Sequence, residues 1–171
     1  MAHLFIWITL RVLKVPVGII RAIQALYRRS VHYIRFGGAT REAFTVCAGV
    51  KQGCPLSGLL FVIVCDSLLR SLCEATPRGG LIRAYADDIA IVLARLWEQA
   101  PSIALLFAEF ALIARLELKP NNCVLLHFGP YELRSVRDLL RETVPMWANF
   151  CIDSYAKYLG LMVGPGAEGK S

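Results

Sequence analysis

The sequence predicts an α+β domain in which an antiparallel sheet is covered by helices on one face. Three observations lead to this class: apolar residues at helical spacing near the N-terminus, two pairs of short β-prone runs separated by turn residues, and two further apolar helical stretches. With 171 residues, of which 56% are hydrophobic, the chain is long enough for one domain with a core. The same composition excludes a disordered protein.

The N-terminal segment predicts a helix over residues 3–29, bent near Pro16 because proline removes a helical hydrogen bond. The segment is basic, and no acidic residue precedes Glu42. An acid-free amphipathic segment that carries arginine is typical of a mitochondrial presequence, of a surface that faces phosphates, or of an ordinary solvated helix. We favour the phosphate-facing surface, because Pro16 and the bulky start of the chain fit a presequence poorly.

The middle of the chain predicts a hairpin, a loop and a helix. Residues 31–36 and 43–48 are expected to be strands, and the glycine pair within residues 37–40 supplies the turn. Residues 49–53 form a loop, and a helix follows over residues 55–74, because proline suits the first helical turn.

The second half predicts a second hairpin, with strands at residues 81–85 and 89–93. The remaining expected elements are a helix over residues 101–116, a strand over 123–128, a helix over 132–141 and a last strand over 155–163.

The apolar runs raise the question of membrane insertion. A spanning helix needs about 20 consecutive apolar residues, and charged residues end or interrupt the runs at residues 4–10, 59–65 and 103–113. We therefore interpret the runs as buried helices and expect no membrane partner. The six cysteines lack C-x-x-C spacing, so we interpret them as small core residues of a reducing compartment.

Asp87 and Asp88 interrupt the apolar second hairpin at the turn between its strands. Burying two adjacent carboxylates is costly, so we expect the turn to hold both side chains outward. Mg²⁺ is typically held by one or two protein carboxylates together with waters and substrate phosphates. Because Asp is also a common turn residue, the pair by itself leaves a metal site and a simple turn both open.

The loop GVKQGCPLS, residues 49–57, is a second distinctive stretch. Gln52 offers an amide that both donates and accepts, Gly53 lets the backbone approach a ligand closely, and Pro55 stiffens the helix start. Standing alone, the stretch would be an ordinary loop that enters a helix.

Together these stretches resemble the reverse transcriptase (RNA-directed DNA polymerase) family, in the style of non-LTR retrotransposon and group II intron enzymes. The Q-G-x-P-x-S pattern falls in residues 52–57, and the Y-x-D-D box falls in residues 85–88. LELKPNNCVLLHFG (residues 116–129) resembles the segment after that box, and YAKYLGLMVGP (residues 155–165) resembles the primer grip.

The resemblance implies a role for each matched position. Asp87 and Asp88 would be catalytic and would ligate Mg²⁺, or Mn²⁺ in its place, while a nucleotide passes from a dNTP to a DNA primer on an RNA template. The residues implied at the template and dNTP pocket are Gln52, Gly53, Pro55, Tyr85 and Ala86. Those implied at the primer grip are Tyr158, Leu159 and Gly160, and those implied at nucleic-acid phosphates are Arg28, Arg29, Arg35 and Lys51.

The resemblance also implies an incomplete domain. The family's palm carries a further aspartate on a strand upstream of the first helix, and no aspartate precedes Asp66 here. We expect residues 1–29 to be the helix after that missing strand and residues 30–165 to be a partial palm-like domain. Residues 166–171 would be a tail, and most of the fingers and thumb would be absent. The chain would then be one part of a longer polyprotein, without processive polymerase activity of its own.

Two other functions stay open on these grounds. One is a catalytically inactive retroelement remnant that at most binds nucleic acid through its basic face. The other is a small organelle-targeted or membrane-associated apolar protein. For location, the sequence favours the nucleus or cytoplasm, with the mitochondrion as the alternative.

Overall fold

The computed structural model describes residues 1–28, 30–76, 79–129 and 132–168. The chain divides into two compact units. The first comprises Met1–Ser67 and Ile113–Leu116, and the second comprises Leu68–Leu112 and Glu117–Ser171. Two of the boundaries fall inside the long helices at Pro55–Ala75 and Leu96–Ala114, so each of these helices contributes residues to both units.

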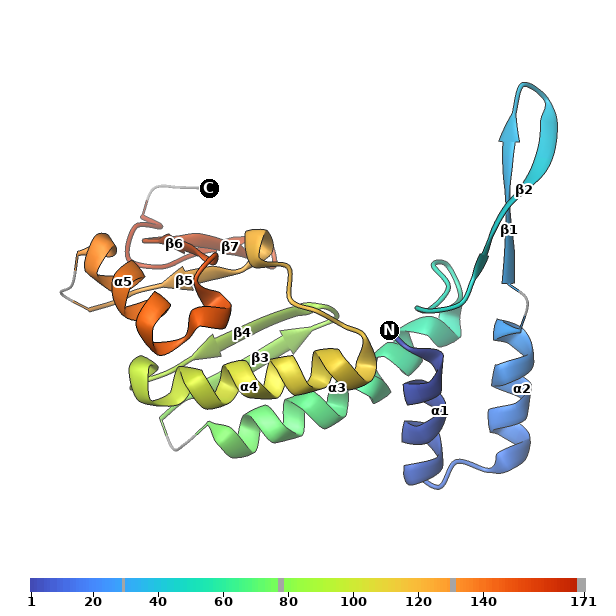
Figure 1. Ribbon diagram of the computed structural model, residues 1–171, viewed down its shortest axis with the longest axis horizontal. Helices are drawn as coiled ribbons and strands as arrows, with labels where there is room; N and C mark the ends of the chain where they lie inside the picture. The colour runs from blue at the N-terminus through green and yellow to red at the C-terminus, as the bar shows by residue number, and fades with distance from the viewer. Residues whose placement is uncertain (29, 77–78, 130–131, 169–171) are drawn as a thin grey trace. The chain divides into compact units, whose positions relative to one another are not determined.

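The elements are a mixture of helices and short strands (Figure 1). The helices are α1 (His3–Val12), α2 (Val17–Tyr27), α3 (Pro55–Ala75), α4 (Leu96–Ala114) and α5 (Leu133–Thr143), with short 3-10 helices at Pro120–Asn122 and Pro145–Trp147. The strands are β1 (Ser30–Phe36), β2 (Ala39–Val46), β3 (Leu81–Tyr85), β4 (Asp88–Val92), β5 (Val124–Leu126), β6 (Cys151–Asp153), β7 (Ala156–Tyr158) and β8 (Leu161–Val163).

Among the described residues, the strands pair only in twos. β1–β2, β3–β4 and β7–β8 are antiparallel, and β5–β6 is parallel. The predicted mixture of helices and strands is therefore confirmed. The prediction of a single antiparallel sheet is wrong for the described residues. Each hairpin strand forms its interstrand hydrogen bonds with its sequence neighbour and with no second strand.

The predicted helix over residues 3–29 is two helices, α1 and α2, which pack against each other. α1 ends where Lys14 takes a φ of 57°, and the N–H groups of Lys14 and Val15 donate back to the last turn of α1 at 2.9 and 3.0 Å. These bonds satisfy the terminal carbonyls in the manner of a Schellman motif. Pro16 then starts α2, so the chain reverses where only a bend was predicted.

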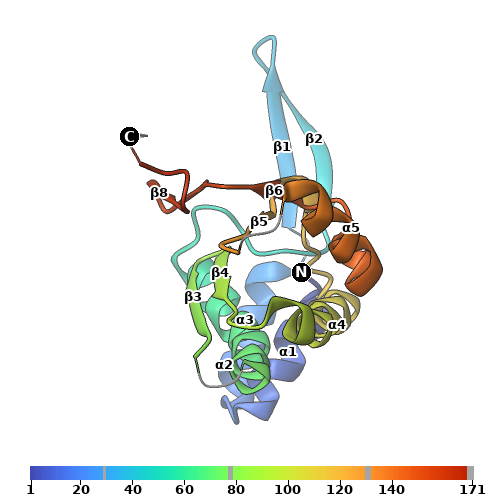
Figure 2. The same cartoon turned by 90° about the vertical axis from the view of Figure 1, so that its left-hand side faces the viewer.

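β1 and β2 form the predicted hairpin. Gly37 and Gly38 have φ values of 57° and 81°, a region in which a side chain is disfavoured. Phe36 pairs with Ala39, so the turn has two residues and the second strand starts earlier than residue 43. The hairpin runs out beyond α2 in Figures 1 and 2, and nearly all of its residues are exposed.

The first unit buries side chains from three helices: Ile6 and Leu10 of α1, Ile20, Ile23 and Tyr27 of α2, and Leu60 and Val64 of α3. α3 begins at Pro55 as predicted. The Tyr27 and Ser57 hydroxyls are buried and 3.0 Å apart, so one hydrogen bond ties the start of α3 to the end of α2.

The second unit has a core of apolar side chains from α3, α4, α5, β5, β6 and the segment between α5 and β6. Its members are Leu68, Leu72, Ala100, Ile103, Ala104, Leu125, Val136, Leu140, Val144, Trp147, Phe150 and Ile152. One face of the β3–β4 hairpin packs against this core through Ile82, Ile89 and Ile91. The core therefore fixes the hairpin that carries Asp87 and Asp88.

α4 begins at Leu96, five residues before the predicted start at residue 101. The buried Gln99 side chain accepts a hydrogen bond from the Arg95 N–H at 3.2 Å, and the Gln99 N–H donates to the Arg95 carbonyl at 3.1 Å. These bonds cap the helix start. Pro101, the first residue of the predicted helix, lies inside α4 instead.

The predicted last strand over residues 155–163 is a hairpin, β7–β8. Leu159 and Gly160 form its turn with φ values of 50° and 87°, and Tyr158 pairs with Leu161. An extended strand cannot hold two consecutive residues in that region, so the chain reverses at this point.

We predict that Gly164, just after β8, tolerates no side chain. Its φ is 123°, and a Cβ there would collide with the Ser154 carbonyl oxygen and lie 2.9 Å from the Tyr155 Cα. Gly164→Ala should lower the free energy of unfolding in urea by about 2 kcal/mol. Gly160→Ala is the control: its added Cβ meets nothing within 4 Å, so we expect only the left-handed backbone penalty of about 1 kcal/mol. Equal losses in the two variants would contradict this prediction.

Two helices, α3 and α4, are long and apolar enough to cross a membrane by length and composition. The apolar runs at residues 59–65 and 103–113 do form helices. In each helix, however, only 28% of the most hydrophobic 18-residue stretch is buried. The core helices of globular proteins can be equally long and apolar, so length and composition are weak evidence for membrane insertion.

The cysteines are not the small core residues that the sequence predicts. All six are free; Cys47, Cys73 and Cys151 are exposed, and Cys54, Cys65 and Cys123 are half-buried. Their apolar sequence neighbours occupy the buried positions instead, as Val64 does beside Cys65.

Candidate functional site

The β3–β4 hairpin holds the four residues of the Tyr-Ala-Asp-Asp stretch. Tyr85 ends β3, Ala86 and Asp87 form a two-residue turn, and Asp88 begins β4 directly opposite Tyr85. Both aspartates are exposed, as predicted. Asp88 was expected in the turn, and it belongs to the strand because it pairs with Tyr85.

The two faces of this hairpin differ. Because residues opposite each other in antiparallel strands share a face, Tyr85 and Asp88 lie on the face opposite Ile82 and Ile91. The isoleucine face packs on the core of the second unit, whereas Tyr85 is 68% exposed. Core packing therefore directs the tyrosine and the second aspartate outward.

Ala86 stands in an unusual conformation for its residue type. Its φ is 52°, in the left-handed region that disfavours a Cβ. Such a residue costs of order 1–3 kcal/mol and persists where the surrounding structure determines it. Here the strand register on both sides of the turn supplies that constraint.

Asp87 and Asp88 are hard oxygen donors of the kind that Mg²⁺ prefers. Within the described ranges, no set of three or more His, Cys, Asp or Glu side chains is grouped to hold a metal ion. Two exposed carboxylates fit a site that substrate phosphates and waters complete. They do not make a closed all-protein cage.

The loop before α3 belongs to the first unit, whereas the Tyr85–Asp88 turn belongs to the second. Gln52 and Gly53 are exposed, and Gly53 has a φ of 78°, a left-handed conformation that glycine adopts without a steric penalty. Pro55 opens α3 and is exposed. The loop thus presents Gln52 to solvent at the start of a long helix.

Two half-buried cysteines of α3 and its preceding loop should differ in reactivity. Hydrogen bonding from the Leu56 backbone lowers the pKa of the Cys54 thiol from its usual 9.0, whereas burial raises the pKa of Cys65 to about 11. Because the thiolate is the nucleophile, Cys54 should react faster with iodoacetamide at pH 7.5, with a rate midpoint below pH 9. Mass spectrometry of the labelled peptides measures both midpoints. Faster labelling of Cys65 would contradict this prediction.

The β7–β8 turn carries the three predicted primer-grip residues. Tyr158 is half-buried at the end of β7, Leu159 is 49% exposed, and Gly160 completes the turn. β7–β8 and β3–β4 are separate two-stranded sheets of the second unit. The three residues therefore lie at a turn that belongs to a different hairpin from the Tyr85–Asp88 stretch.

The predicted phosphate-binding cations have different surroundings. Arg28 and Arg35 are exposed, whereas the half-buried Lys51 ammonium donates to the Leu26 carbonyl at 2.6 Å and lies 5.7 Å from the centre of the Tyr27 ring. Arg29 lies outside the described residues. Lys51 thus caps the end of α2, and Arg28 and Arg35 keep the solvent-facing position that phosphate contact requires.

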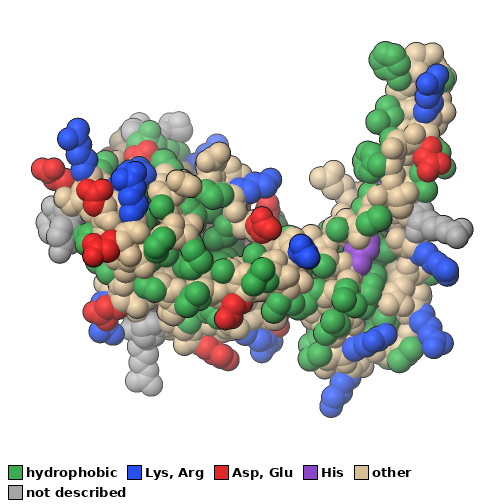
Figure 3. All heavy atoms as spheres, viewed as in Figure 1, with side chains coloured by type: hydrophobic (Ala, Val, Ile, Leu, Met, Phe, Trp, Pro, Cys, Tyr) green, Lys and Arg blue, Asp and Glu red, His purple; other side chains and the backbone are tan. Residues whose placement is uncertain are grey.

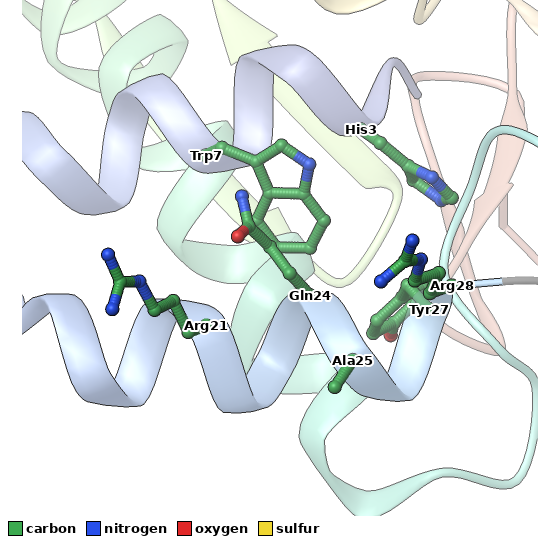
Figure 4. Close-up of a pocket in the computed structure, with 7 residues that line it drawn as sticks. All are labelled: His3, Trp7, Arg21, Gln24, Ala25, Tyr27 and Arg28. Carbon is green, nitrogen blue, oxygen red and sulfur yellow. The ribbon is translucent and has the colours of Figure 1, made fainter.

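A pocket between α1 and α2 was missed by the sequence reasoning (Figure 4). It is lined by His3, Trp7, Arg21, Gln24, Ala25, Tyr27 and Arg28. Arg21, Gln24 and Arg28 are spaced i, i+3 and i+7, which places them on one helix face. The spacing of these three residues in the sequence indicates a shared polar face. A single helix over residues 3–29 has no second helix facing it, so the prediction of one helix gave no pocket.

Comparison with known proteins gives a family match over most of the chain. Residues 2–163 match the family described as reverse transcriptase (RNA-dependent DNA polymerase). The chain is 35% identical over 96 residues to the "Retrovirus-related Pol polyprotein from type-2 retrotransposable element R2DM" of Drosophila melanogaster, covering 53% of this chain and 9% of that protein. It is 32% identical over 107 residues to the Pol polyprotein of a type-1 R2 element from Popillia japonica, covering 58% of this chain and 18% of that protein.

These relatives are retrotransposon polyproteins, and the aligned segment spans less than a fifth of the length of either one. The family match includes both distinctive stretches, residues 49–57 and 85–88, and the β7–β8 turn. The chain belongs to the reverse transcriptase (RNA-dependent DNA polymerase) family.

Proposed function

We propose that the chain carries part of the nucleotidyl-transfer site of an RNA-directed DNA polymerase, with Asp87 and Asp88 as the metal-binding and catalytic carboxylates. The observation that carries this proposal is the β3–β4 turn, where core packing on one face leaves both carboxylates exposed. Membership of a polymerase family supports the same reaction. Its substrates are a dNTP, a DNA primer and an RNA template.

The family generally uses a divalent metal. Two exposed carboxylates match the donor set of Mg²⁺, or of Mn²⁺, when substrate phosphates supply further oxygens. A bound metal would supply positive charge that stabilises the phosphate oxygens during transfer. The protein's own part is to hold two carboxylates at a rigid turn, which the register of β3 and β4 and the core contacts of Ile82 and Ile89 provide.

Other positions take supporting roles in this proposal. The exposed Tyr85 and the strained Ala86 lie beside the carboxylates and contact the primer end or the incoming nucleotide. Gln52, Gly53 and Pro55 line the pocket for the template base and dNTP. The set Tyr158, Leu159 and Gly160 holds the primer, and Arg28 and Arg35 contact phosphates. The whole then acts as a palm-like part of a longer Pol polyprotein, as its relatives are.

One observation favours a second function, a retroelement remnant that binds nucleic acid without catalysis. The described residues contain no third acidic side chain grouped with the Asp87–Asp88 pair. A metal site with two protein ligands depends more heavily on the substrate, so we expect no processive primer extension by the 171-residue chain alone.

A nucleotide-retention experiment separates the two functions. The purified chain is mixed with poly(rA)·oligo(dT) and radiolabelled dTTP, in Mg²⁺ or in EDTA, and bound dTTP is measured by filter retention. We expect dTTP to be retained in Mg²⁺ and released by EDTA, while mismatched dGTP is not retained. Retention of the primer-template without any Mg²⁺-dependent dTTP would contradict the polymerase proposal and favour the remnant.

A further inference from the structure

The pocket between α1 and α2 is a second place at which the first unit can bind a ligand. Its volume is about 530 Å³, within the range of about 300–1,000 Å³ typical of ligand sites. In Figure 4, His3 and Trp7 come from α1, Arg21, Gln24, Ala25 and Tyr27 come from α2, and Arg28 directly follows α2. Among the elements of the first unit, the pocket therefore belongs to the helix pair and uses no residue of the loop before α3.

Three aromatic rings form the inner side of this pocket. The Trp7 ring centre lies 6.0 Å from that of His3 and 6.1 Å from that of Tyr27, and the His3 and Tyr27 centres are 5.3 Å apart. Tyr27 is buried and bonded to Ser57, and the His3 ring nitrogen lies 2.9 Å from the Gly49 carbonyl. These contacts hold the rings in place, while the half-buried Trp7 keeps indole surface toward the pocket.

The charged lining is entirely cationic. Arg21 and Arg28 are exposed, and in Figure 4 their guanidinium groups lie on either side of Trp7. In the described part of the chain, neither guanidinium lies within ion-pair distance of a carboxylate. Figure 3 shows Lys and Arg side chains, and no acidic ones, on the visible face over α1 and α2, since the first acidic residue is Glu42.

These features specify a ligand with both a flat aromatic group and negative charges. Arg28 is seven positions after Arg21, a rise of about 10.5 Å at helical spacing, so the two can contact different phosphates of one strand. Gln24 lies between them with an amide that can donate and accept. An acidic peptide without an aromatic residue would satisfy the arginines but leave the Trp7 face without a stacking partner.

We propose that this pocket binds single-stranded RNA, with a base stacked on Trp7 and neighbouring phosphates held by Arg21 and Arg28. Aromatic stacking and arginine–phosphate contacts are the usual means by which proteins hold unpaired nucleotides. This proposal depends on the proposed polymerase function in one respect, the choice of RNA as the ligand. It requires neither the metal nor Asp87 and Asp88.

The test is fluorescence anisotropy of a 5′-fluorescein-labelled 12-nucleotide oligoadenylate with the full 171-residue chain, in EDTA. Arg21→Gln and Arg28→Gln should each weaken binding about 5-fold at 0.1 M salt and reduce the salt slope by about 0.7, the loss of one phosphate contact. Trp7→Ala should weaken binding about 10-fold through lost stacking. Trp7→Phe keeps a ring in the aromatic cluster and should lose less, with folding of every variant checked by circular dichroism.

Arg11→Gln is the matched control, because Arg11 is an exposed arginine of α1 that does not line the pocket. It should bind like the wild-type chain. Equal losses in Arg11→Gln and Arg21→Gln would overturn the proposal, since binding would then follow charge alone. An abasic 12-mer that binds as tightly as oligoadenylate, or AMP that competes as well as the strand, would also overturn it. Because EDTA removes the metal, these results do not depend on the nucleotide-retention experiment.

Discussion

Asp87→Asn should weaken Mn²⁺ binding by at least about 10-fold when dTTP and a primer-template are present, because even outer-shell partners of a bound metal contribute that much. The substitution keeps the shape of the side chain and removes one of the two negative charges at the β3–β4 turn. A divalent ion held by two protein carboxylates loses a large share of its electrostatic attraction with one of them. Free Mn²⁺ is measured by electron paramagnetic resonance, with Mn²⁺ as a paramagnetic substitute for Mg²⁺.

The same variant carries a second signature. Two adjacent carboxylates repel each other without a metal, so Asp87→Asn should leave the metal-free stability unchanged or slightly higher. The control is Asp138→Asn on α5, because Asp138 is also exposed and its nearest cation, Arg141, is an exposed neighbour at 3.5 Å. Mn²⁺ affinity that falls equally in both variants would show that the metal responds to net charge rather than to the turn.

Leu140→Ala should lower the free energy of unfolding by about 3 kcal/mol, the range for a leucine truncated in a packed core. Leu140 of α5 is 0% exposed and belongs to the core of the second unit, together with side chains of α3, α4 and β5. Truncation leaves a cavity that helices fixed by other contacts cannot fill. Urea denaturation followed by circular dichroism measures the change.

The matched control for that prediction is Leu112→Ala on α4. Leu112 is 79% exposed in the second unit, so its truncation should change the free energy of unfolding by no more than about 0.5 kcal/mol. A loss as large as that of Leu140→Ala would mean that Leu112 is covered in solution. Leu140→Ala should also weaken the packing of the β3–β4 hairpin against this core. A loss of Mn²⁺ affinity in that variant would show that the core packing supports the Asp87–Asp88 turn.

Local chemistry predicted the hairpins and the candidate carboxylates. Gly37 and Gly38 supply left-handed φ values without a steric penalty, so that turn follows from residue type alone. Likewise, two adjacent charges cannot lie in a covered strand, so the exposure of Asp87 and Asp88 was predictable. The start of α3 followed from Pro55 in the same way.

The predictions of element boundaries fail where a side-chain hydrogen bond or the pairing of two strands determines the local backbone. Gln99 caps α4 through its own buried amide, a bond that periodicity does not reveal, so the helix starts before Pro101. At Leu159 a residue that favours strands or helices is held in a turn, because β7 and β8 pair on both sides of it. Propensity is worth less than such a ladder of hydrogen bonds.

By itself the sequence determined the mixture of helices and strands, the first two hairpins, the exposed pair of aspartates and the match to the reverse transcriptase family. It did not predict strand β6 (Cys151–Asp153), which pairs in parallel with β5. Only the tertiary structure decided that the N-terminal segment folds back at Lys14 and Pro16, and that Asp88 lies in a strand. The same reversal brings Trp7 close to Tyr27 and opens the pocket between α1 and α2. The physical reason is that hydrophobic spacing specifies which face of an element is buried, whereas a neighbouring element decides what that face meets.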